Sequence, residues 1–205
     1  MKKSGGFFLF SAVFFLLSAQ NFTEDEAKIS AELIRNFSEA QSNHYSVSPT
    51  ENRRISRHFI CYCENLEISF EEGLKILQNY EDYENRFRYI TRSQNTDSNN
   101  YFFILGIPLA RTWLWGGVYE NIGKNEAEIT FVQTKSEINY SDSVRSPITI
   151  DFETLVLQWN LLKIDEHNSR FCLTGIAEPT RAVPQWLIRT ALKRVIPRTL
   201  RDLRE

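Results

Sequence analysis

The sequence is poor in the residues on which most catalytic and metal sites depend. Its 205 residues include only three Cys, three His and eight Gly. It has no glycine-rich phosphate loop and no Gly-x-Ser-x-Gly nucleophile motif. Cys61 and Cys63 form a C-x-C pair, and His44, His58 and His167 are scattered, so the spacing of zinc ligands is absent. We therefore expect no catalytic residue, no metal site and no cofactor.

A strong overall charge is also missing, because the formal net charge is only −2. Proteins that bind nucleic acid depend on clustered Lys and Arg to neutralise phosphates, so this balance argues against a nucleic-acid partner. The charge is unevenly distributed, however. Residues 181–205 contain seven Arg or Lys against two acidic residues, which gives the C-terminal end a net positive charge.

The apolar run at the start of the chain, residues 7–17, is shorter than the ~20 apolar residues that span a bilayer. Lys2 and Lys3 precede this run, and Ser18 and Ala19 follow it. Such an order is typical of a secretory signal peptide. We expect residues 1–20 to form one, cleaved near residue 19, and the protein to be secreted or periplasmic. The alternative is a membrane anchor formed by an uncleaved N-terminal segment.

Residues 21–54 are expected to form a short amphipathic helix and a linker ahead of the compact domain. The segment from Thr23 to Glu26 is a capping-box pattern. Ile29, Leu33 and Phe37 then repeat every four residues, which predicts a helix to about residue 40. Residues 41–52 are rich in Ser, Asn and Pro and predict a loop.

Residues 55–205 are expected to form one domain in which a sheet precedes a long helix. A second capping box at residues 69–72 predicts a helix that ends near Tyr80, with a further turn at 81–86. Alternating apolar residues predict strands, which short connections make antiparallel. The predicted strands are 55–68, 88–92, 101–105, 111–121, 127–137, 152–165 and 170–178. Residues 93–100 predict a turn, and 139–149 predict a long polar loop.

The last stretch, residues 182–204, predicts a long helix with two distinct faces. At 100° per residue, apolar side chains fill about half the circumference, and Arg189, Lys193, Arg194, Arg198 and Arg201 fill the other half. Pro184 suits the first turn of a helix, and Pro197 is expected to bend it. The wide apolar face needs an apolar sheet to cover, which indicates an α+β container.

This order of elements resembles the START/Bet v1-like (SRPBCC, polyketide cyclase/dehydrase and lipid transport) superfamily. Two stretches carry the resemblance locally. Ile107-Pro-Leu-Ala-Arg111-Thr112 is similar to the START pattern of Pro, a few residues, Arg-Asp and a strand, with Thr112 where Asp is usual. Trp159-Asn-Leu-Leu and, later, Val183-Pro184-Gln-Trp-Leu-Ile188 are similar to the family's Trp-containing strand and its entry into the last helix. Leu157 stands where a Gly is frequent.

The resemblance implies a helix-grip fold, in which a curved antiparallel sheet wraps around a long C-terminal helix and encloses an apolar cavity. Members bind sterols, phospholipids, quinones, polyketides or other apolar ligands. We accordingly expect a START-like lipid-binding domain for transport or sensing, with the basic helix face available for transient membrane-surface contact. The expected ligand-binding residues are Arg111, Trp113, Trp115, Tyr119, Ile129, Phe131, Leu157, Trp159, Ile188, Leu192 and Val195.

Two other functions and the state of the cysteines are left open by the sequence. A minority of the superfamily are enzymes, and a cyclase/aromatase would use polar groups such as Tyr62, Asp82, Arg145 or Arg170. A domain whose cavity is filled by side chains would instead be a ligand-free interaction module. Because the first and last strands are neighbours in this fold, Cys172 is within reach of Cys61 or Cys63; otherwise all three are buried thiols.

Overall fold

In the computed structural model, the described residues are 44–49, 56–97, 99–107, 110–133, 149–180 and 183–205. The predicted signal peptide and the predicted helix at 23–40 lie outside them. No described helix is both long and apolar enough to cross a membrane. The described elements are β1 His44–Pro49, β2 Ser56–Leu66, α3 Phe70–Gln78, η2 Tyr80–Asp82, α4 Tyr83–Arg86, β3 Ile90–Asp97, β4 Asn100–Ile107, β5 Ala110–Ile122, β6 Glu126–Gln133, β7 Phe152–Lys163, β8 Ser169–Pro179 and α5 Gln185–Asp202.

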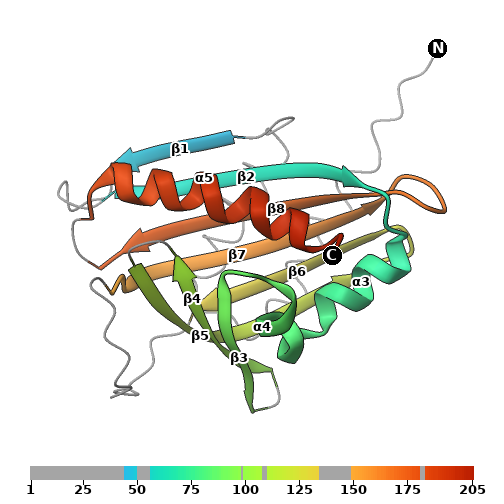
Figure 1. Ribbon diagram of the computed structural model, residues 1–205, viewed down its shortest axis with the longest axis horizontal. Coiled ribbons are helices and arrows are strands. Elements are labelled where there is room, and N and C mark those ends of the chain that lie inside the picture. The colour runs from blue at the N-terminus through green and yellow to red at the C-terminus, as the bar shows by residue number, and fades with distance from the viewer. Residues whose placement is uncertain (1–43, 50–55, 98, 108–109, 134–148, 181–182) are drawn as a thin grey trace.

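The eight strands form one antiparallel sheet in the order β1-β2-β8-β7-β6-β5-β4-β3. The sheet is curved, and α5 lies across its concave face above β2 and β8 (Figure 1). This is the α+β architecture expected from the sequence, with the first and last long strands as neighbours. Two segments differ most from the prediction: β1 lies in the predicted loop 41–52, and β3 extends through most of the predicted turn 93–100.

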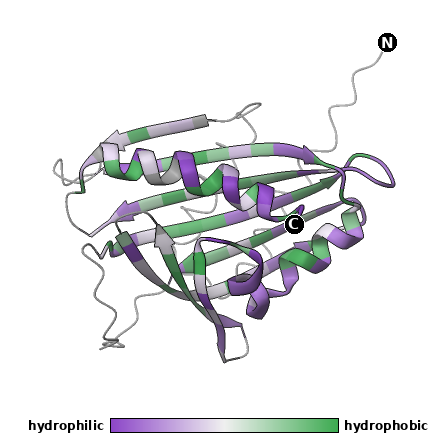
Figure 2. Cartoon of the chain, viewed as in Figure 1, coloured by the Kyte–Doolittle hydropathy of each residue, from purple (hydrophilic) through white to green (hydrophobic). Residues whose placement is uncertain are grey.

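Side-chain alternation along the strands produces a buried cluster on each face of the sheet. The larger cluster lies on the concave side and includes Ile129, Phe131 and Trp159, together with side chains of α3, α4 and α5. The smaller one, on the opposite face, is formed by Phe59, Cys61, Val132, Val156 and Ile176. Figure 2 shows hydrophobic residues alternating along the central strands and along α5. The alternation follows from the two-residue period of a strand.

The short helices close one end of the concave face. Helix α3 begins as predicted at Ser69, whose hydroxyl accepts a hydrogen bond from the backbone N–H of Glu72 at 3.2 Å. Gly73 allows α3 to approach the sheet, because a Cβ there would lie 2.5 Å from Cζ of Phe171. The predicted further turn is present as η2 and α4, which bury Tyr80 and Tyr83.

Helix α5 is continuous from Gln185 to Asp202 although Pro197 lies inside it. Its sheet-facing side buries Ile188, Ile196 and Leu200, as the predicted apolar arc requires, and Leu203 is buried directly after its end. The strands below it are covalently joined, since Cys63 of β2 and Cys172 of β8 face each other in register and form a disulfide, with 4.1 Å between their Cα atoms. Of the two predicted partners of Cys172, the structure thus selects Cys63 and leaves Cys61 as a buried thiol.

Candidate ligand-binding cavity

An apolar cavity of about 190 Å³ lies between the concave face of the sheet and α5. Its wall is formed by side chains from nearly every strand, by the aromatic residues of η2 and α4, and by α5. Representative lining residues are Ile60 of β2, Leu114 of β5, Leu155 of β7, Leu173 of β8, Tyr83 of α4 and Ile196 of α5. The described lining residues include no Lys, Arg, Asp or Glu. The cavity is therefore suited to apolar, uncharged contents.

Six of the predicted ligand-binding residues line this cavity. They are Ile129, Phe131, Leu157, Trp159, Ile188 and Val195. The side chain of Leu192, which was also predicted, lies outside the described residues. Four of the six lie on the strand faces that the alternation predicted, Ile129 and Phe131 on β6 and Leu157 and Trp159 on β7. The other two, Ile188 and Val195, lie on α5.

The four predicted residues of β5 lie on the other face of that strand. Thr112, Leu114 and Val118 line the cavity, so Arg111, Trp113, Trp115 and Tyr119 point away from it. Trp115 packs against Phe102 with ring centroids 6.2 Å apart, and Tyr119 packs against the outer cluster. Both faces of β5 are apolar, so its composition does not indicate which face lies inside.

The cavity residues that the sequence did not predict include His58 and Thr112. The His58 side chain is 2% exposed, and its Nδ1 lies 2.9 Å from the hydroxyl oxygen of Tyr45. Burial lowers the pKa of His58 below its usual 6.5, which favours the neutral imidazole. For Thr112 the one indirect signal in the sequence is its position next to Arg111, in the stretch that resembles START proteins.

Two of the tyrosine hydroxyls at the cavity wall, those of Tyr80 and Tyr83, are already bonded. The hydroxyl of Tyr83 donates to the backbone carbonyl of Leu77, and that of Tyr80 donates to the carboxylate of Glu120. Burial raises the pKa of both phenols well above the usual value, so neither ionises near neutral pH. The two tyrosines contribute aromatic surface to the cavity, and they also fix η2 and α4 against the sheet.

The volume limits what the cavity holds in this conformation. Sites for drug-sized ligands measure about 300–1,000 Å³, whereas an apolar cavity of about 150 Å³ admits benzene. At about 190 Å³, the cavity fits a guest of one or two rings or a short chain. A sterol or a two-chain lipid would require the walls to move apart.

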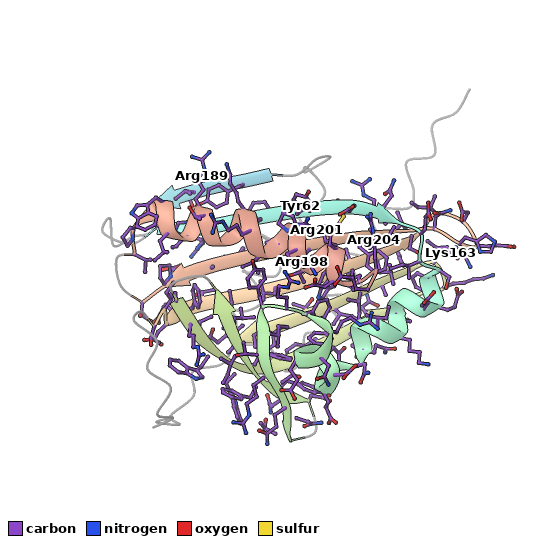
Figure 3. All side chains as sticks on the ribbon, viewed as in Figure 1. Tyr62, Lys163, Arg189, Arg198, Arg201 and Arg204 are labelled. Carbon is purple, nitrogen blue, oxygen red and sulfur yellow. A yellow bond between two sulfur atoms is a disulfide. The ribbon has the colours of Figure 1, made fainter. Side chains whose placement is uncertain are left out.

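The outward face of α5 combines basic residues with one exposed aromatic side chain. Trp186 is 63% exposed, and Arg189, Lys193 and Arg194 are exposed on the following turns. Figure 3 shows Arg189 projecting outward from the helix. Arg198, which was grouped with these residues, is instead engaged by Asp202 and Glu205. The exposed basic surface therefore lies mainly on the N-terminal two-thirds of α5.

Known proteins resemble this chain in their three-dimensional structures, whereas their sequences do not match it. No family model matches the chain, and no curated protein matches its sequence. Human StAR-related lipid transfer protein 5 superposes with a TM-score of 0.62 at 8% identity, covering 86% of this chain and 91% of that one. The STAR-related lipid transfer protein of Xanthomonas axonopodis gives 0.58 at 12% identity, covering 80% and 93%. The Zhui aromatase/cyclase of a Streptomyces species gives 0.56 at 8% identity, covering 72% and 91%.

These likenesses establish that the chain has the START/Bet v1-like superfamily fold, as the order of its elements predicted. The eight-stranded sheet with α5 across its concave face is consistent with the helix-grip arrangement. At 8–12% identity, the similarity carries no individual site residue from those proteins to this chain.

Proposed function

We propose that the protein binds a hydrophobic ligand in the cavity beneath α5 and serves in its transport or sensing. The observation that carries this proposal is a cavity walled almost entirely by apolar side chains inside a fold shared with lipid transfer proteins. The driving force would be removal of apolar ligand surface from water, at about 25 cal/mol per Å². No charge has to be desolvated at the described part of the wall.

Native mass spectrometry of the gently purified protein, followed by organic extraction, tests the proposal directly. We expect a stoichiometric apolar molecule in the wild type. Ala177→Trp places a large ring in the cavity, because Ala177 is one of its lining residues, and should displace the ligand. Ser46→Trp adds the same ring at an exposed position on β1 and should retain it. A wild-type protein that neither carries nor takes up any apolar molecule would refute the proposal.

A transport role requires access to a membrane, and the outward face of α5 supports one. Trp side chains favour the membrane–water interface, and each basic residue near an anionic surface contributes about 1 kcal/mol. We propose that Trp186, Arg189, Lys193 and Arg194 form a transient contact with anionic lipid. Arg201 is also exposed, although its guanidinium donates to the carbonyl of Pro197 at 3.3 Å.

Export of the protein is proposed from residues 1–20 and is supported by the disulfide. Cysteine pairs persist mainly in oxidising compartments, and Cys63 and Cys172 are paired here. Fusion of residues 1–20 to a reporter enzyme that is active only after export tests this proposal. A reporter that is retained inside the cell would contradict it.

A cyclase-type enzyme is the second candidate, and His58 is the observation that favours it. This titratable side chain lines the cavity and is held by Tyr45, an arrangement that positions a general base. A cyclase would convert a polyketide chain and lose turnover in His58→Asn, which keeps an amide near Tyr45. Recovery of the polyketide unchanged from the wild type would eliminate this candidate.

A further inference from the structure

One side-chain polar atom in the cavity wall is buried without a hydrogen-bond partner among the described residues. Thr112 is 3% exposed and lines the cavity, and no described residue bonds its Oγ1. The side chains of His58, Tyr80, Tyr83 and Thr199, which also line the wall, each have a hydrogen-bond partner. The Thr199 hydroxyl, for example, donates to the carbonyl of Val195 at 2.9 Å, and the Tyr83 hydroxyl donates to that of Leu77.

Within the described part of the chain, Thr112 has no partner because its neighbours on the concave face are apolar. Thr112 shares its strand face with Leu114 and Val118. Its register partner on β4 is Leu105, which also lines the cavity. The backbone carbonyl next to Thr112 is already engaged, because that of Arg111 accepts a hydrogen bond from the N–H of Ile150 at 3.0 Å. A threonine in this position therefore presents its hydroxyl to a space walled mainly by apolar side chains.

An unpaired buried hydroxyl is costly, and such groups in folded proteins nearly always have a partner. A trapped water needs two to four polar partners, whereas the described wall offers Thr112 Oγ1 as its one unpaired buried side-chain atom. A ligand that carries its own polar group satisfies the hydroxyl with a single hydrogen bond. A charged group would lose its hydration with no opposite charge in the described wall to compensate.

We propose that the cavity takes a small uncharged apolar molecule with one hydroxyl or carbonyl group, and that this group hydrogen-bonds to Thr112 Oγ1. The inference rests on the proposed ligand-binding function and specifies its ligand class. It excludes free fatty acids and phospholipid head groups from the interior. The cavity volume of about 190 Å³ limits the guest to about the size of two fused rings.

Three matched probes of that size test the inference by isothermal titration calorimetry at pH 7. They are 2-naphthol, its hydrocarbon analogue 2-methylnaphthalene, and the charged 2-naphthoate. The wild type should bind 2-naphthol about five- to tenfold more tightly than 2-methylnaphthalene, the ratio that one buried hydrogen bond supplies. It should bind 2-naphthoate at least tenfold more weakly than 2-naphthol.

Variants of Thr112 assign the preference to the hydroxyl. Thr112→Val keeps the shape and removes the oxygen, so 2-naphthol should weaken about five- to tenfold while 2-methylnaphthalene binds equally well or better. Thr112→Ser should keep the preference for 2-naphthol. Thr174→Val is the control, because Thr174 is equally buried but its hydroxyl donates to Sγ of Cys61 on the outer face. It should leave all three affinities unchanged.

The outcomes separate failure of the inference from failure of the proposed function. Suppose that the protein binds 2-methylnaphthalene while Thr112→Val still binds 2-naphthol more tightly than 2-methylnaphthalene. That result would overturn the role of Thr112 and leave the binding function intact. Tight binding of 2-naphthoate would overturn the restriction to uncharged ligands. If none of the three probes binds, and the purified protein also holds no apolar molecule, the proposed function itself fails and the inference fails with it.

Discussion

Asp202 accepts a hydrogen bond from the backbone N–H of Arg88, with 3.0 Å between N and Oδ2, and thereby ties the end of α5 to the segment between α4 and β3. Its other oxygen lies 2.6 Å from Nε of Arg198, one turn earlier on α5. Asp202 is only 2% exposed. A buried carboxylate with a charged partner and a backbone donor fixes this end of the helix.

Replacing Asp202 with Ala should lower the free energy of unfolding by about 3 kcal/mol. The reason is that the Arg88 N–H and the Arg198 guanidinium would both lose a partner in a poorly solvated site. Urea denaturation measures the loss. Glu205→Ala is the matched control, because Glu205 also pairs with Arg198 but is exposed, and it should cost less than 1 kcal/mol. Equal effects of the two variants would show that Asp202 is not a structural anchor.

Thr112→Val should raise the stability of the ligand-free protein by about 1 kcal/mol, although it weakens binding of an alcohol. The substitution removes a buried oxygen without a partner and keeps the side-chain volume. Thr174→Val removes a buried hydroxyl that has a partner and should destabilise by about 0.5 kcal/mol. Thermal denaturation of delipidated protein distinguishes the two. A loss of stability in Thr112→Val would indicate that its hydroxyl is already satisfied in the absence of ligand.

The Cys63–Cys172 disulfide should contribute about 2–5 kcal/mol, because it closes a loop with a sequence separation of 109 residues. The Cys63→Ser/Cys172→Ser double variant should unfold at lower urea concentration, and reducing agent should no longer affect it. Cys61→Ala should retain the bridge and stay sensitive to reducing agent. Thiol titration should find one reactive thiol per chain after unfolding under non-reducing conditions. Three reactive thiols would contradict the pairing.

The basic face of α5 should dominate binding to anionic vesicles. Removing the charges of Arg189, Lys193 and Arg194 together should weaken binding to phosphatidylserine vesicles by about 3 kcal/mol, roughly a hundredfold. Trp186→Ala should weaken it further. Vesicle sedimentation at low salt provides the measurement.

The control for this prediction removes three exposed basic residues elsewhere on the surface, Lys75, Arg92 and Lys124. Both triple variants change the net charge equally, so their affinities for the vesicles should differ only if the membrane contacts α5 directly. Similar losses would indicate long-range attraction instead of docking through the helix.

His58 should make the protein less stable in mildly acidic solution. Burial lowers the pKa of His58 in the folded protein below 6.5, so the unfolded chain binds the proton more readily. Stability from the neutral imidazole is therefore present above pH 6.5 and declines as the pH falls below it. His58→Asn should show a flatter stability profile between pH 7.5 and 5. Parallel profiles for the two proteins would contradict the assignment to His58.

The architecture was predictable because alternation and helical periodicity are local properties of the sequence. Leu155, Leu157, Trp159 and Leu161 recur every second residue, and the structure places them on one face, as predicted. The edge strand β1 was missed for the opposite reason. Its segment is polar apart from Tyr45 and Val47 and contains Pro49, and it becomes a strand through pairing with β2, a contact that no local pattern encodes.

The site was only partly predictable, because the sequence of a strand with two apolar faces does not indicate which face points into the cavity. On β5, Trp113 and Trp115 were the predicted cavity residues, yet the structure turns Thr112 and Leu114 inward, where they pair with Leu105 and Phe103 of β4. The inward polar residue is the one that a hydrophobicity pattern would place outside. Its position is set by long-range strand pairing, and the unpaired hydroxyl that results cannot be recognised before the fold is known.

The disulfide also determines which wall can yield to a guest larger than about 190 Å³. The floor beneath α5 is covalently closed, since Cys63 and Cys172 join β2 to β8, and these strands cannot separate at that point. The opposite margin of the sheet has no described bridge, and the pairing of β3 with β4 is irregular near Ile90 and again near Asn95. We therefore expect the two sides of the cavity to differ in rigidity. When a larger ligand enters, β2 and β8 should stay in place, and β3 and β4 should move outward.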